Sequence, residues 1–184
     1  RSNDGSRGLG DVYKRQLEIR GGGNLVGDAQ SGHIKNIGYA LYLRMLEDAI
    51  KLLTNQTTAV RAKVDIKLTV SAFISDEIVS EDRLRLELYR RLSQCESPSE
   101  IYEIEEEVGD RFGKPDTPTK QFFEIMVIKL LCIEKKIKMV SNYNQNITIE
   151  YQSGIKETLQ SKSKDDDDLI ATVLHYLRMT KGKV

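Results

Sequence analysis

The feature that most constrains the fold is a change of hydrophobic spacing that occurs twice within residues 64–184. Residues 64–70 read V-D-I-K-L-T-V, and apolar side chains at every second position are typical of a half-buried strand. Between about residues 80 and 133 the apolar residues recur at helical spacing, and strand-like runs return in 137–140 and 147–151. A last amphipathic helix follows. The order of strand, three helices, β-hairpin and C-terminal helix predicts a small α+β domain rather than a parallel βαβ sheet.

Helix start signals divide the middle of this domain into three helices. Ser80 is expected to cap the first, and Ser97-Pro98-Ser99-Glu100 forms a capping box with proline at the first helical position. The second helix is expected to end near Phe112 and to form a hairpin with the first. Thr117-Pro118 repeats the start signal for a third helix, which carries the most apolar run of the chain. We therefore expect the third helix to lie at the centre of the core.

Composition excludes several classes of protein. The 28 basic and 28 acidic residues give a formal net charge of +0, so the whole chain is not a basic nucleic-acid binder, and any DNA contact must be local. No stretch approaches the roughly 18 continuous apolar residues of a membrane span, and no signal peptide is visible. A cytoplasmic protein without membrane contact is the expectation.

The residue types that bind metals do not form a recognisable site. Cys95 and Cys132 lack close Cys or His neighbours and are expected to be buried free thiols. The run Asp165–Asp168 suits a solvated helix start, since four consecutive carboxylates point in different directions. His33 and His175 lack catalytic partners at useful spacing and are expected to have structural roles. We predict no metal site.

A glycine-rich stretch at residues 17–34 reads L-E-I-R-G-G-G-N-L-V-G-D-A-Q-S-G-H-I. Its early glycines let the backbone approach a ligand closely, and Arg20 and Gln30 carry hydrogen-bonding groups suited to phosphates or base edges. A P-loop is excluded, because Asp28-Ala29 stands where the phosphate-binding Lys and its Ser or Thr should be. The dinucleotide fingerprint is excluded by Val26, which occupies the position of the third glycine.

This stretch resembles the motif L-E-I-R-G-A-G-N-L-L-G-x-x-Q-S-G-H-I, which follows the last helicase motif of bacterial transcription-repair coupling factors. It departs from that motif at Gly22 and Val26. A looser form occurs in the branch-migrating helicase of recombination, where it is thought to turn ATP-driven closure of the motor into movement along duplex DNA. The resemblance implies a role in DNA translocation and coupling for Arg20, Gly21, Gly23, Asn24, Gly27 and Gln30.

Two further runs resemble the C-terminal module of the same family. They are R-L-E-L-Y-R-R-L over residues 85–92 and E-I-Y-E-I-E-E-E-V-G-D-R-F-G over residues 100–113. The resemblance covers residues 17–140 by motif and the last forty or so by pattern alone. It implies that the chain is a fragment that begins just downstream of the ATPase lobes of its parent protein.

The resemblance and the local patterns together divide the chain. Residues 1–16 are expected to be non-native, because G-D-V-Y-K-R-Q looks like translated sequencing-adapter read-through. Residues 17–53 are interpreted as the tail of a RecA-like motor lobe, made of the glycine-rich loop and an amphipathic helix. Polar residues without periodicity at 54–63 indicate a linker. Residues 64–184 form the C-terminal regulatory domain.

Strongly charged helix faces in the second half have two interpretations. Such faces are usually only solvated. The resemblance adds another, since the family's C-terminal module is held to lie against the N-terminal module that recruits the repair ATPase UvrA, masking it until the factor engages stalled polymerase. A polar contact of this kind can open reversibly. The candidate residues for this intramolecular interface are Arg85, Arg90, Arg91, Glu103, Asp110 and Arg111.

The resulting hypothesis is the C-terminal part of an ATP-dependent double-stranded DNA translocase. By resemblance, the parent uses ATP and Mg, displaces stalled RNA polymerase and recruits excision repair. No nucleotide-binding residue is visible in this chain, so it is expected to bind no cofactor and to hydrolyse no ATP alone. One alternative is an autonomous protein-interaction domain without a role in translocation. A stand-alone DNA-binding domain is a third, which neutral charge and the lack of a groove-reading motif disfavour.

Overall fold

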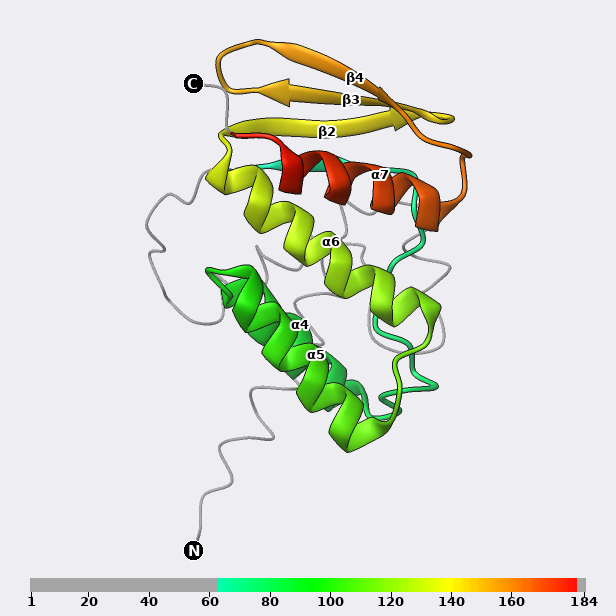
Figure 1. The fold of residues 1–184 in the computed structure, drawn as a ribbon. Coiled ribbons are helices and arrows are strands. Elements are labelled where there is room, and N and C mark those ends of the chain that lie inside the picture. The colour runs from blue at the N-terminus through cyan, green and yellow to red at the C-terminus, as the bar shows by residue number, and fades with distance from the viewer. Residues whose placement is uncertain (1–62, 182–184) are drawn as a thin grey trace, which may run out of the picture.

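The structure, a computed structural model, describes residues 63–181 and places a β-sheet over layers of helices (Figure 1). The strands are β1 (Asp65–Lys67), β2 (Ile137–Tyr143), β3 (Asn146–Tyr151) and β4 (Lys156–Gln160). The helices are α4 (Asp82–Gln94), α5 (Pro98–Phe112), α6 (Thr117–Glu134) and α7 (Asp166–Met179). Helix α7 lies beneath the sheet, α6 follows it, and α4 and α5 pair on the far side of α6 (Figure 1). The predicted α+β class is confirmed.

The sheet is mixed, with strand order β1-β2-β3-β4. The predicted hairpin is present as β2 and β3, and Asn144 in its tight turn has a positive φ of 52°, a conformation that asparagine tolerates well. Two features were not predicted. Strand β1 pairs in parallel with β2, so helices α4 to α6 form the crossover between them. Strand β4 adds a further antiparallel edge, and its single apolar residue, Leu159, explains why no alternation revealed it.

The helix boundaries follow their capping signals closely. The capping box is confirmed at α5, where the Glu100 carboxylate accepts hydrogen bonds from the backbone N–H groups of Glu96 at 2.5 Å and Ser97 at 3.3 Å. Helix α6 begins at Thr117 as predicted, and the Asp116 side chain caps it by accepting from the Thr119 N–H. The predicted cap at Ser80 is wrong. The N-cap of α4 is Glu81, which makes no side-chain capping bond, and its carbonyl accepts the first hydrogen bond of the helix from the Arg85 N–H at 3.1 Å.

Helix α6 lies at the centre of the core, which confirms the prediction made from its apolar run. It packs against α5, α7 and β2. Its buried residues lie all around its circumference, as expected for a helix covered on several sides. They are Thr119, Gln121, Phe122, Phe123, Ile125, Met126, Val127, Ile128 and Cys132.

The chain after β1 stays extended and crosses the core instead of continuing the sheet. The predicted strand over residues 64–70 is therefore longer than the observed one, which ends at Lys67. Alternate side chains remain buried along this segment, so its backbone N–H groups need acceptors within the protein. The donors and acceptors are Thr69 N to Asn142 Oδ1 (2.8 Å), Ser71 N to Asp166 Oδ2 (2.8 Å), Phe73 N to Pro118 O (3.2 Å), Ile74 N to Tyr89 Oη (2.8 Å) and Ser75 N to Thr119 Oγ1 (3.0 Å).

Tyr89→Phe should destabilise the chain, because it leaves the buried N–H of Ile74 without its acceptor while the ring keeps its place against Phe122. The expected loss is about 1–3 kcal/mol in the free energy of unfolding, measured by urea denaturation. Tyr102→Phe is the matched control. That tyrosine is 45% exposed, and its loss of a hydroxyl should change stability by less than about 0.5 kcal/mol. Equal effects of the two substitutions would contradict the role given to Tyr89.

Candidate regulatory interface on helices α4 and α5

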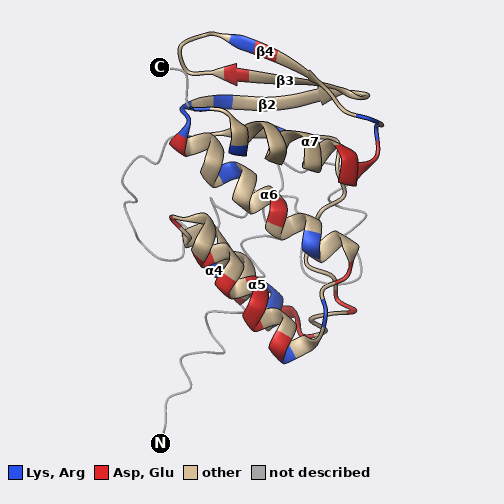
Figure 2. Cartoon of the chain, viewed as in Figure 1, with Lys and Arg blue, Asp and Glu red and all other residues tan. Residues whose placement is uncertain are grey.

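The candidates for regulation all lie within the part of the chain that the structure describes, on the hairpin of α4 and α5. The six candidates for DNA translocation, from Arg20 to Gln30, lie outside it, as do the predicted helix at 37–53 and nearly all of the predicted linker. Charged residues occur on both helices of the hairpin, and acidic ones are prominent along α5 (Figure 2). The local structure of α4 and α5 therefore decides which charges a partner could meet.

Arg85 is buried, although it is one of the candidate interface residues. Its side chain is 1% exposed, Nη1 donates to the carbonyl oxygen of Val79 at 2.5 Å, and Nη2 forms an ion pair with Asp82 at 2.5 Å. The interpretation of Arg85 as an exposed interface residue is wrong. Its place one turn before Leu88 and Tyr89 puts it on the buried stripe of α4, so helical spacing could have shown this.

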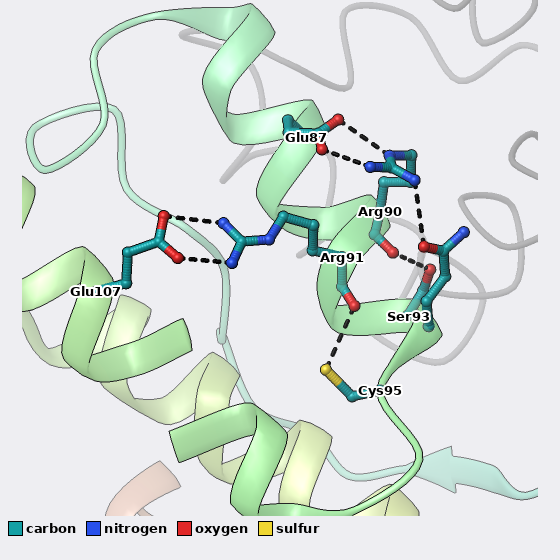
Figure 3. A network of polar contacts seen from close by, with 7 residues as sticks. Glu87, Arg90, Arg91, Ser93, Cys95 and Glu107 are labelled. Carbon is teal, nitrogen blue, oxygen red and sulfur yellow. Dashed lines mark hydrogen bonds and ion pairs between the residues drawn. The ribbon is translucent and has the colours of Figure 1, made fainter. Parts of the chain in front are cut away.

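The exposed arginines of α4 have partners inside the domain (Figure 3). Arg91 forms a two-pronged pair with Glu107 of α5, with nitrogen–oxygen distances of 2.9 and 2.6 Å. Arg111 also donates to Glu107, at 3.0 Å. Arg90 binds Glu87 on its own helix, at 3.0 and 2.5 Å. Of these three arginines, only Arg91 joins α4 to α5, and Glu107, which was not among the candidates, binds both Arg91 and Arg111.

The electrostatics of this cluster follow from the same contacts. Hydrogen bonds from Arg91, with a further one from Arg111, lower the pKa of Glu107 to about 2. The Glu107 carboxylate in turn raises the pKa of Arg91. Hydrogen bonding from Arg90 lowers the pKa of Glu87. All of these groups are charged at neutral pH, so the Arg91–Glu107 ion pair joins α4 to α5, although a pair this exposed stabilises by no more than about 1 kcal/mol.

A row of exposed acidic side chains on α5 is open to a binding partner. Glu103, Glu106 and Asp110 are exposed, and spacings of three and four residues place them on one face of α5. None of the three forms an ion pair or a side-chain hydrogen bond with the residues that the structure describes. The arrangement presents a negative face, which we call the acidic face, on a braced two-helix support.

The aspartate run and the two cysteines, which are the other residue types that could bind a metal or react, have structural roles. The carboxylates of Asp166, Asp167 and Asp168 accept from Ser71 N, Gln121 Nε2 and Ser163 Oγ, so the aspartate run ties α7 to three places. Cys95 and Cys132 are buried as predicted, and burial raises the pKa of the Cys132 thiol to about 12. Between residues 63 and 181, no group of three or more Asp, Glu, His or Cys is arranged to hold a metal ion. No helix there has the length and apolar character to cross a membrane.

Comparison with known proteins identifies the family. Residues 68–161 match the TRCF domain. A transcription-repair-coupling factor of Helicobacter pylori (strain ATCC 700392 / 26695) is 54% identical over 167 residues, which cover 91% of this chain and 17% of that protein. The chain belongs to the transcription-repair coupling factor family. A further member, from Rickettsia prowazekii, is 32% identical over 94% of the chain and 15% of its own length.

A solved structure shows the same fold for the described domain. The crystal structure of the C-terminal domain of transcription-repair coupling factor superposes with a TM-score of 0.58 at 19% sequence identity. It covers 65% of this chain and 94% of the solved one. The chain spans about a sixth of the length of the coupling factors that it matches, so most of such a protein lies outside it.

The pH dependence of stability should report the cluster around Glu107. Because its folded-state pKa lies below the ordinary value of 4.5, the stabilisation is present above pH 4.5 and is lost as pH falls towards about 2. Glu107→Gln should therefore lower the free energy of unfolding at pH 7, by no more than about 1 kcal/mol at this half-exposed site. The difference from the unmodified chain should shrink below pH 4.5.

Chemical denaturation at pH 7 and at pH 2.5 to 3 measures this difference. Glu106→Gln is the matched control, since it removes an equivalent charge from the same helix without breaking an ion pair. A Glu107→Gln effect that is independent of pH would mean that the carboxylate charge is not what joins α4 to α5.

Proposed function

We propose that the described domain is the C-terminal regulatory module of a transcription-repair coupling factor and that residues 17–53 belong to the end of its motor. The intact protein uses ATP and Mg to move along double-stranded DNA, displaces stalled RNA polymerase and recruits excision repair. Family membership supports the proposal, and so does the motif in residues 17–34. In this scheme the chain alone hydrolyses no ATP.

The module acts by masking the UvrA-binding module of its parent until polymerase is engaged. The observation that carries this proposal is the acidic face, because its three carboxylates have no partner among the described residues, whereas the neighbouring arginines do. A charged, solvated contact can open and close, unlike a large apolar seam. The complementary surface should be basic, and salt should weaken the contact.

A second function is supported by the independence of the domain. Residues 63–181 have a contiguous core made from both the sheet and the helices, which is the property expected of an autonomous interaction domain. In that case the acidic face would bind a separate protein, and its removal would not change the binding of UvrA. The two proposals differ in the sign of one measurement.

Removal of the mask should increase the affinity of the parent protein for UvrA. Deletion of residues 64–184 from the full-length coupling factor is expected to tighten UvrA binding at least tenfold, since each 1.4 kcal/mol of lost restraint corresponds to about tenfold. Isothermal titration of UvrA against intact and truncated proteins measures the change. Unchanged or weaker binding would favour the function as an autonomous interaction domain over the masking function.

Neutralising the acidic face should reproduce part of this effect without deletion. The full-length triple variant Glu103→Gln, Glu106→Gln, Asp110→Asn is expected to bind UvrA several-fold more tightly. A control triple, Asp76→Asn, Glu77→Gln, Glu81→Gln, removes three exposed acidic charges from the loop before α4 and should bind as the unmodified protein does. Equal behaviour of the two triples would show that net charge, not the acidic face, is responsible.

Arg20 should couple ATP hydrolysis to movement. In the full-length protein, Arg20→Ala is expected to retain ATP hydrolysis and to lose displacement of stalled RNA polymerase, because it removes a coupling contact and leaves the hydrolytic residues intact. Lys35→Ala, a loss of positive charge just after the motif, is the control and should keep both activities. Parallel loss of both activities in Arg20→Ala would indicate a folding defect, and retention of both would remove Arg20 from the mechanism.

A further inference from the structure

A polar cleft separates the N-terminal half of α6 from α7, on a part of the domain that the acidic face does not include. Its volume is about 450 Å3. Its lining combines charged side chains of both signs with the apolar residues Leu174 and Ala171. The remaining lining residues are Thr117, Lys120, Gln121, Glu124, Asp167, His175 and Arg178.

The carboxylate of Glu124 in this cleft is not paired with a cation. Its carboxylate is half-buried and forms no hydrogen bond or ion pair within residues 63–181, and desolvation raises its pKa. Lys120 and Arg178 are close enough to favour its charged form, yet neither lies within 4 Å of it. Arg178 instead donates to the hydroxyl of Tyr102 at 3.2 Å.

The surroundings of Glu124 add negative charge. Asp167 lines the same cleft and accepts from Gln121 at 2.7 Å, which leaves its charge uncompensated by a cation. Glu105 of α5 is half-buried nearby, and both Asp167 and Glu105 raise the pKa of Glu124 further. Two carboxylates, Glu124 and Asp167, and two cations, Lys120 and Arg178, line the cleft, and Glu105 adds a third carboxylate close to Glu124 from outside the lining. A partly desolvated carboxylate without a partner is destabilising, so its presence suits a site that receives a cation.

We propose that this cleft binds an arginine or lysine side chain presented by a protein segment and that Glu124 is the carboxylate that receives it. The apolar Leu174 and Ala171 in the lining can pack against the methylene stem of such a side chain, whose charged end then reaches Glu124. A guanidinium can pair with both carboxylate oxygens. Lys120 and Arg178 at the cleft remain available to acidic neighbours of that cation, which favours a peptide over a bare metal ion.

This site stands apart from the masking function. The acidic face is made of residues on α5 alone, whereas half of the cleft comes from α7, which lies beyond the residues 68–161 that match the TRCF domain. The cleft can therefore take its partner whether or not the module masks the UvrA-binding module.

Nuclear magnetic resonance titration of the 184-residue chain tests the proposal. The probes are the peptide acetyl-Ala-Arg-Ala-amide and its counterpart with citrulline, a neutral isostere of arginine, each titrated into the millimolar range. The arginine peptide should shift the backbone amides of residues 120–124 and 171–178, and the citrulline peptide should not. Glu124→Gln should weaken binding at least tenfold, while Glu106→Gln on the acidic face should leave it unchanged.

The melting temperature of Glu124→Gln distinguishes loss of a site from loss of the fold. Because the carboxylate is desolvated and unpaired, the variant should melt at the same temperature as the unmodified chain or higher at pH 7. Equal binding of the two peptides, shifts confined to α5, or undiminished binding by Glu124→Gln would each overturn the proposal.

Discussion

The domain depends on the hydrogen bonds, two of them fully buried, that the extended segment after β1 makes to the sheet and to three helices. A buried backbone N–H without an acceptor is strongly unfavourable, and this segment has left the sheet that would otherwise supply acceptors. Asn142 of β2, Asp166 of α7, Tyr89 of α4 and Thr119 of α6 supply them instead. One stretch of chain therefore fixes the sheet and three helices relative to one another, and α5 is then positioned by α4 and α6.

The two proposed binding surfaces follow from this scaffold. With α4 held by Tyr89 and by the buried Arg85, Arg91 reaches α5 and binds Glu107. Arg90, Arg91 and Arg111 are thereby paired within the domain, and the acidic face is left for the proposed partner. On the other side of α5, Glu105 contributes negative charge to the cleft at Glu124. The helix α5 thus carries the acidic face on one side and contributes one carboxylate near the cleft of mixed charge on the other.

Local signals predicted the elements whose causes are local. The capping box at Ser97, the start signal and apolar run of α6, and the β2–β3 hairpin each lie within about twenty residues of sequence, and each is confirmed. Contacts between residues far apart in the sequence could not be predicted from local patterns. The parallel pairing of β1 with β2 joins segments about seventy residues apart, as the Thr69–Asn142 bond does. The charge of Arg85 indicates an exposed residue, whereas its helical spacing to Leu88 and Tyr89 places it on the buried stripe of α4.

Hydrogen exchange of the backbone amides in the 184-residue chain tests the central claim most directly. If the extended segment holds the domain together, the amides of Thr69, Ser71, Ile74 and Ser75 should exchange only through global unfolding, with the same opening free energy as the central amides of α6. Exchange of these amides through a local opening of much lower free energy, while α6 stays protected, would contradict the claim. The segment would then be a peripheral strap rather than the part on which the fold depends.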